Sequence, residues 1–366
     1  MNMIYLFLIL LPVFIITMFM PYWTRKTESF GVSIPEEIYH LDNIKKLRKQ
    51  YVQFSGIASI LVVVLFLVLS FIDNLDEITF ALSFSLLIFL YLIGTFFIYL
   101  HFHRAMKRLK QLENWGQEKA QAIFVSTDFR SHKLIHSNAW FIISFLITFA
   151  MITITFMFYD RIPEQIPIQY NMSGEVTNWE DKSTRILLAM PIMSLYLTLL
   201  FMFLNTMIAK AKQQISAEKP EESLQQNIIF RRRWSMYLIV TGIGLTLLFA
   251  FIQFSFIFSV NPAILTISPL VFTAILTLWA IILAITTGQG GSRIKVSTGT
   301  NGEVINRDDD SNWKLGIFYF NTNDPALFLE KRFGIGWTIN WARPLAWSIM
   351  LGIILLAVVI PLLLGM

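Results

Sequence analysis

Residues 139–159 read AWFIISFLITFAMITITFMFY, a run without Asp, Glu, Lys, Arg or His. An α-helix rises about 1.5 Å per residue, so roughly 20 apolar residues cross the hydrocarbon core of a bilayer. The run is therefore predicted to span a membrane. Similar uncharged windows occur elsewhere in the chain, at residues 2–22, 54–72, 78–100, 186–209, 235–260, 263–287 and 345–364.

The composition of the whole chain agrees with this reading. Of its 366 residues 55% are hydrophobic and only 14% are charged, with a mean hydropathy of +0.60, whereas soluble domains keep roughly a quarter of their residues charged. We predict an all-α membrane protein of about eight transmembrane helices, with a short ordered outer loop and a small mixed cytoplasmic or interfacial element before the last helix. The predicted regions are residues 1–136, 137–209, 210–290, 291–344 and 345–366.

The distribution of basic residues predicts the orientation. If the N-terminus lies outside, 26 of the 29 Lys and Arg fall in cytoplasmic loops, as the positive-inside rule requires. We therefore expect a multi-pass plasma-membrane protein with both termini outside, whose net charge of +5 reflects these loops and not a nucleic-acid partner. Asp42 is predicted to cap a basic helix that meets the headgroups of the lipid bilayer and runs into the 54–72 window.

The residues that usually carry catalysis or bind metals are scarce. The absence of cysteine excludes disulfides, thiolate metal sites and cysteine nucleophiles. His101 and His103 have basic neighbours that would repel a cation, the glycines at 288–291 lack the Lys-Ser/Thr of a phosphate-binding loop, and Asp308 to Asp310 suit a solvated turn. We expect no cofactor, no metal and no enzymatic activity.

The one sizeable outer loop, residues 160–184, carries the signs of local order. Pro163 and Pro167 favour extended backbone, the alternation within 166–170 suits a strand, and 171–174 can form a turn with a positive φ angle. An ordered loop between two spans is a natural place for a soluble ligand to bind. It could equally be a structural plug that ties the two spans together.

This loop resembles a known pattern, carried by Pro163, Ile166-Pro167-Ile168, Tyr170-Asn171, Gly174 and Lys182. The pattern is similar to that of a bacterial membrane domain of unknown function, which also occurs in the SdpI-like family of immunity proteins against the sporulation-delaying toxin. The similar stretch runs from the 139–159 window into the 186–209 window. It departs from the family at Gln169, where the family usually has His.

The resemblance implies a Gram-positive plasma-membrane protein. With the ordered outer loop, it leads to the hypothesis of a non-enzymatic protein that recognises or confers tolerance to an extracellular peptide, or senses envelope stress. The expected recognition residues are Pro167, Gln169, Tyr170, Asn171, Gly174 and Lys182.

The long inner loop, residues 288–344, is predicted to fold. We expect flexible glycines at 288–292, then a short helix from Asp324-Pro325 to Gly334, with aromatic residues at the membrane interface. Its 313–344 part resembles a second domain of unknown function. A cytoplasmic regulator could dock on five of its residues, namely Trp313, Asn321, Asp324, Trp337 and Asn340.

Two alternatives remain open. A transporter or permease could place its pathway around Pro191, Pro269 and Gln253, although the windows lack the charged residues that ion-coupled carriers normally use. The two prolines could also be ordinary irregularities of helix packing. A membrane scaffold could instead dock a cytoplasmic partner through residues 313–341.

Overall fold

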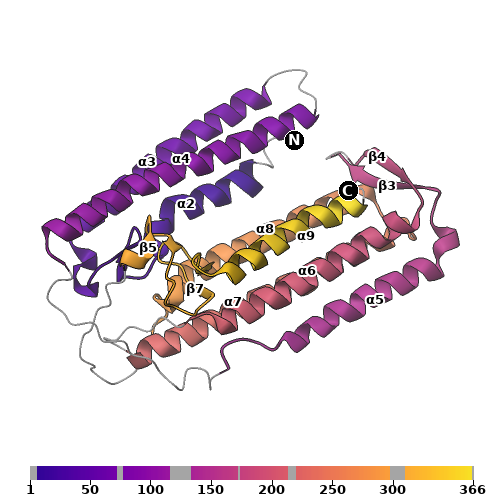
Figure 1. Cartoon of the computed structure of the whole chain (residues 1–366). Helices are drawn as coiled ribbons and strands as arrows, with labels where there is room; N and C mark the ends of the chain where they lie inside the picture. The colour runs from indigo at the N-terminus through magenta and orange to yellow at the C-terminus, as the bar shows by residue number, and fades with distance from the viewer. Residues whose placement is uncertain are drawn as a thin grey trace. The chain divides into compact units, whose positions relative to one another are not determined.

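The computed structural model describes residues 6–71, 77–115, 133–171, 174–212, 220–296 and 310–364 (Figure 1). The chain forms two compact units. The first comprises Met1–Ser131, Lys212–Phe230 and Ile281–Ala342. The second comprises His132–Ala211, Arg231–Ala280 and Arg343–Met366.

Long apolar helices dominate both units, as the sequence predicted. Within the described residues, seven helices are long and apolar enough to cross a membrane: α3 (Asp42–Ser70), α4 (Glu77–Leu112), α5 (Ile142–Met157, preceded by the 3-10 turn Asn138–Phe141), α6 (Thr184–Lys210), α7 (Pro220–Phe254), α8 (Pro262–Thr287) and α9 (Pro344–Leu364). A shorter apolar helix, α2 (Leu11–Trp23), follows a π-helical turn at Leu6–Leu10. The structure confirms the all-α membrane class with about eight spans, and such helices imply a bilayer environment.

In the first unit, α2, α3 and α4 meet around one tyrosine. The hydroxyl of Tyr91 on α4 lies 2.7 Å from the Thr17 hydroxyl of α2 and 3.0 Å from the Ser59 hydroxyl of α3. Apolar side chains, among them Phe14 and Phe66, surround this contact. Interhelical hydrogen bonds of this kind help to fix which faces of membrane helices pack together.

In the second unit, α5, α6 and α7 share buried polar contacts at separate levels. Near the middle, the Ser194 hydroxyl of α6 lies 2.9 Å from that of Thr148 on α5 and 3.4 Å from that of Thr246 on α7. Toward the chain end of α6, the Asn205 amide donates to the His136 carbonyl at 3.0 Å and the Asn138 amide oxygen at 2.8 Å.

The third set of buried polar contacts in this unit is made by the Gln253 side chain of α7. Pro191 has no N–H, so within α6 it cannot bond the carbonyl of Leu187, four residues earlier. The Gln253 amide of α7 donates to that carbonyl at 2.9 Å and to the Thr155 hydroxyl of α5 at 3.1 Å. The amide nitrogen of Gln253 thus takes over the backbone bond that the proline removes, as neighbouring helices can do in membranes.

Two predictions on local structure near the membrane need correction. Helix α3 does run without interruption from the basic segment into the apolar window, but Asp42 does not cap it. The cap position is Leu41, which contributes no side-chain bond, and the Asp42 carboxylate pairs with Lys45 at 3.2 Å.

The glycine segment at 288–292 is not a flexible linker, because Gln289 to Gly291 are buried. The Gln289 amide bonds the backbone of Gly336 twice, at 2.8 and 2.9 Å.

Short hairpins complete both units. They pair β1 (Glu28–Ser29) with β2 (Val32–Ser33), β3 (Gln165–Tyr170) with β4 (Val176–Asp181), β5 (Trp313–Lys314) with β6 (Phe318–Tyr319), and β7 (Phe328–Glu330) with β8 (Trp337–Ile339). The remaining elements are short 3-10 turns at Glu36–His40, Tyr159–Arg161, Gln289–Gly291 and Asp310–Asn312.

The prediction of a short helix from Asp324 to Gly334 is wrong. The Asp324 carboxylate accepts a bond from the N–H of Ala326, two residues on, at 3.0 Å. This closes a turn of the kind that Asp favours, instead of bonding the third helical N–H. The chain then enters β7, which pairs with β8.

Candidate functional site

The outer loop of the second unit forms the predicted strand, β3, and the predicted turn, and a second strand, β4, completes a hairpin with them (Figure 1). Its turn is closed by bonds from the Asn171 N–H to the Glu175 carbonyl at 2.9 Å and from the Gly174 N–H to the Asn171 carbonyl at 3.0 Å. Gly174 has a φ angle of +82°, which glycine adopts at little cost. The Asn171 amide also donates to the Glu175 carboxylate at 2.8 Å, so side chains and backbone fix the turn together.

The base of the hairpin is anchored to the helices that follow and precede it. Ile166 is fully buried and belongs to a cluster with Ile162, Leu187 and Phe256. Lys182 donates to the Ile162 carbonyl at 3.0 Å and pairs with Glu164 at 3.2 Å. The hairpin is therefore a rigid extension of the helical unit.

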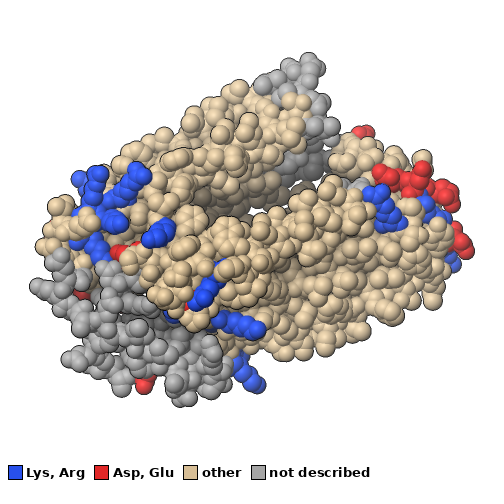
Figure 2. All heavy atoms as spheres, in the orientation of Figure 1, with Lys and Arg blue, Asp and Glu red and all other residues tan. Residues whose placement is uncertain are grey.

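The rest of the hairpin is exposed, and its charge is predominantly acidic. Trp179 and Ile168 keep 52% and 38% of their surface exposed. Carboxylates gather over the end of the molecule that carries β3 and β4 (Figure 2). Residues 160–185 contain the acidic residues Asp160, Glu164, Glu175, Glu180 and Asp181 and the basic residues Arg161, Lys182 and Arg185.

The structure places the six predicted recognition residues on one element. Pro167, Gln169 and Tyr170 lie on β3, and Asn171 and Gly174 form the turn. Of these, Gln169 is exposed and Tyr170 is half-buried, which raises the pKa of Tyr170. Lys182, the sixth, points into the base instead of toward the exposed face.

The residues that make the exposed face of the hairpin acidic and aromatic were not among the predicted recognition residues. Trp179, Glu180 and Asp181 end β4, opposite Pro167, Ile166 and Gln165. The signal was available, since Val176, Thr177 and Trp179 favour strands and follow directly after the turn.

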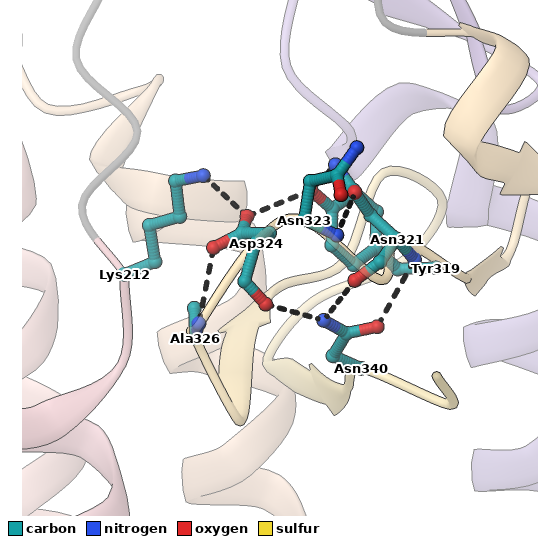
Figure 3. A network of polar contacts seen from close by, with 7 residues as sticks. All are labelled: Lys212, Tyr319, Asn321, Asn323, Asp324, Ala326 and Asn340. Carbon is teal, nitrogen blue, oxygen red and sulfur yellow. Dashed lines mark hydrogen bonds and ion pairs between the residues drawn. The ribbon is translucent and has the colours of Figure 1, made fainter. Parts of the chain in front are cut away.

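In the first unit, the segment predicted to dock a regulator holds together through an internal network (Figure 3). The Asp324 carboxylate pairs with Lys212 and accepts a bond from the Tyr319 hydroxyl at 2.7 Å. Burial alone would raise the pKa of Asp324, but the bonds from Lys212, Ala326 and Tyr319 outweigh it and lower that pKa. The Asn340 amide bonds the carbonyls of residues 321 and 324 at 2.9 and 3.1 Å.

These contacts assign most of the predicted docking residues to the interior. Trp313, Asp324 and Asn340 are buried, whereas Asn321 and Trp337 are only partly buried. The buried three hold the hairpins together, and docking of a regulator through this segment stays a prediction.

A second set of charges is buried beside this network. Glu330 pairs with Arg25 and accepts a bond from the Asn227 amide at 2.8 Å. Asp310 pairs with Arg332 and with Lys110. Removal of one partner from a buried ion pair leaves the other charge uncompensated, which is strongly destabilising.

Glu28 lies among these charges in a deeply buried position. Burial raises the pKa of Glu28 to about 7; Arg25 and Arg332 oppose this shift, and Glu330 and Asp310 reinforce it. Its Oε2 atom has no hydrogen-bond partner within the part of the chain that the structure describes. Across that same part, no group of three His, Asp or Glu side chains could hold a metal ion; the predicted turn residues Asp308 and Asp309 lie outside it.

Two family models match short parts of the chain. A domain of unknown function (DUF1648) matches residues 146–195, which include most of α5, the hairpin and the start of α6. A family of unknown function (DUF5808) matches residues 322–347, the part of the first network around Asp324 and Asn340 with the start of α9. No curated protein and no solved structure matches the chain. The chain thus contains regions similar to two families of unknown function, at the two places where the sequence showed resemblances.

Proposed function

We propose that this multi-pass membrane protein binds cationic extracellular peptides through the β3–β4 hairpin and thereby confers tolerance to them, as the SdpI-like resemblance suggests. In this proposal the protein lies in the plasma membrane, with the hairpin and both termini outside, and it acts without catalysis. The observation that supports it is an anchored, exposed hairpin with an excess of carboxylates.

The charges and the exposed aromatic residue favour this class of ligand. A surface of one sign attracts ligands of the opposite sign and raises their association rate. Exposed tryptophans are frequent energetic centres of protein interfaces, and Trp179 stands between the carboxylates of Glu180 and Asp181 and the turn. Because the base is anchored, little ordering of the hairpin would oppose binding.

The structure also weakens the main reason for the transporter alternative. Gln253 was a candidate pathway residue because it is a polar group inside a span. Its amide nitrogen donates to the Leu187 carbonyl that Pro191 leaves unbonded and to Thr155. These contacts involve the amide nitrogen of Gln253 in helix packing, whereas its buried Oε1 atom has no hydrogen-bond partner among the described residues.

The proposal is tested by the growth of a deletion strain in the presence of a panel of secreted cationic peptides. The strain is complemented with the wild type or with a triple variant, Glu164→Gln/Glu180→Gln/Asp181→Asn. We expect loss of tolerance to at least one peptide, restored by the wild type and not by the triple variant. Full restoration by the triple variant would contradict hairpin recognition.

A matched control removes the same number of charges from the other unit. Glu36 and Asp42 form exposed or partly exposed pairs there, such pairs contribute little to stability, and Glu37 is exposed. Their amide variant should restore tolerance fully. The orientation is tested separately with Thr177→Cys, since the chain has no other cysteine; a membrane-impermeant maleimide should label this variant in intact cells.

A further inference from the structure

The backbone of the hairpin shows which groups its outer edges offer. The N–H of Lys182 donates to the Glu164 carbonyl at 2.7 Å, so these residues form a hydrogen-bonded pair of the antiparallel ladder. Bonded and non-bonded pairs alternate along such a ladder. The next pair, Gln165 with Asp181, is therefore non-bonded, and so is Pro167 with Trp179.

In a non-bonded pair, the N–H and carbonyl of each residue point away from the partner strand. Trp179 and Asp181 thus direct two donors and two acceptors toward the outer edge of β4. Among the residues that the structure describes, the sheet contains β3 and β4 alone. Both Trp179 and Asp181 are exposed.

The two edges of the hairpin are not equivalent. On β3, the corresponding outward position is Pro167, which has no N–H; proline is tolerated at edge positions for this reason. A register shift between Pro167 and Gln169 disturbs that edge further, as bulges do on edges that avoid pairing. At the end of β4, Trp179 and Asp181 keep both their outward N–H groups and both their outward carbonyls.

The charge beside the β4 edge identifies the occupant. Glu180 and Asp181 belong to the strand and Glu175 precedes it. The basic residue next to this edge in the sequence, Lys182, has a side chain only 6% exposed and is bonded at the base. The carboxylates beside the edge therefore favour an extended, basic segment.

We propose that an extended cationic peptide adds to β4 as a third strand, bonded to the backbone of Trp179 and Asp181, with its basic side chains on one face of the sheet, beside either the Glu180 or the Asp181 carboxylate, which lie on opposite faces of β4. Addition of a strand to an exposed edge is a recurrent mode of peptide recognition. The inference rests on the proposed function, because it states how the hairpin holds its ligand.

The test uses the full chain in phosphatidylcholine nanodiscs and the probe acetyl-(Lys-Val)4-amide, an alternating cationic peptide, with affinity measured by calorimetry. Trp179→Pro/Asp181→Pro removes both outward N–H groups, whereas Trp179→Ala/Asp181→Ala removes the same side chains and keeps them. Each lost hydrogen bond weakens binding roughly two- to tenfold. Because two bonds are lost, we expect the proline variant to bind about four- to a hundredfold more weakly than the alanine variant.

Hydrogen exchange provides a readout that needs no variant. In the wild type, saturating probe should slow exchange at the amides of Trp179 and Asp181 at least about tenfold, and it should leave Glu180, already paired with β3, unchanged. Binding without this protection, or equal affinities of the proline and alanine variants, would overturn strand addition.

The charge variant separates the two proposals. Suppose that Glu164→Gln/Glu180→Gln/Asp181→Asn binds the probe more weakly than the wild type, while the wild type shows no protection at Trp179 and Asp181 with saturating probe. This result would support hairpin recognition and refute strand addition. No measurable binding of the probe by the wild type would count against both.

Discussion

The contact between Gln253 and the proline of α6 permits a sharp test of the packing of the second unit. We consider Gln253→Leu, which replaces the amide with an apolar side chain of similar size. The change deletes bonds of 2.9 Å to the Leu187 carbonyl and 3.1 Å to the Thr155 hydroxyl. Pro191 supplies no N–H, so the Leu187 carbonyl is left without its replacement donor.

The magnitude follows from the two bonds. Interhelical hydrogen bonds in membranes contribute about 0.6 kcal/mol on average and about 1.7 at most, and a buried carbonyl left unbonded costs about 1–3 kcal/mol. We expect Gln253→Leu to lower the free energy of unfolding by about 1–3 kcal/mol. In a Pro191→Ala background, the new N–H of residue 191 can bond Leu187, so the same change should cost about 1 kcal/mol less.

The assay is reversible unfolding of the full chain in mixed detergent micelles, followed by circular dichroism for the four members of the double-mutant cycle. Asn205→Leu serves as a control, because its bonds lie 14 residues along α6, roughly 21 Å from Pro191, and should be additive with Pro191→Ala. Additivity of Gln253→Leu with Pro191→Ala, within about 0.3 kcal/mol, would refute the argument that Gln253 replaces the missing backbone bond.

Three further predictions concern the first unit. Gly31→Ala should destabilise this unit by more than about 2 kcal/mol, because the φ angle is +74° and a Cβ would lie 2.4 Å from the Gly316 carbonyl oxygen. Gly336→Ala, at a φ of +107° with open space around it, should cost only the backbone strain of about 1–2 kcal/mol. Equal losses of stability for the two variants in thermal denaturation would contradict this. The folded state holds a proton on Glu28 that the unfolded chain releases above pH 4.5. The stability contributed by protonated Glu28 is therefore complete below pH 4.5 and is lost as pH rises to about 7. The unfolding free energy of the wild type minus that of Glu28→Gln should fall by up to about 3 kcal/mol across this window, and a difference that does not change with pH would refute this. The pKa of Asp324 is lowered in the folded state, so the stability that its carboxylate contributes is present above the unfolded pKa of 3.8 and is lost as pH falls through the lower folded pKa. Asp324→Asn should cost about 1–2 kcal/mol at pH 7, and this cost should decrease steadily as pH is lowered below 3.8. A cost that stays constant throughout acid titration would exclude the carboxylate charge as its cause.

The sequence predicted those parts of the fold that follow from local chemistry. An uncharged run of some 20 residues has only one stable state in a bilayer, so the apolar windows recur as helices. Pro167 and Gly174 restrict or permit particular φ angles, so the strand and its turn were also predictable. In each case the deciding information lies within a few residues.

The errors occurred where distant residues decide. Asp324-Pro325 is a sound helix start by local rules, but Lys212 and Tyr319 hold the Asp324 carboxylate in a turn that leads into a strand. The glycines after residue 287 look flexible in isolation, yet Gln289 is bonded to Gly336. The strand β4 could have been predicted from its local sequence, but which of its backbone groups point outward depends on the register with β3, which one strand alone does not reveal.

Leu187 connects the proposed recognition element with the irregular part of its supporting helix. Its side chain is fully buried against Ile166 at the hairpin base, and its carbonyl is the group that Pro191 leaves to Gln253. A side chain fixes the position of its own backbone, so the packing of Ile166 and the bond from Gln253 act on the same residue. Removal of the proline would let α6 bond itself there, and the helix would no longer depend on α7 at this level. With Pro191 in place, the residue against which the hairpin base packs is bonded through Gln253 to α7 and, by the same amide, to α5. The position of the hairpin therefore depends on α5, α6 and α7 together and not on α6 alone.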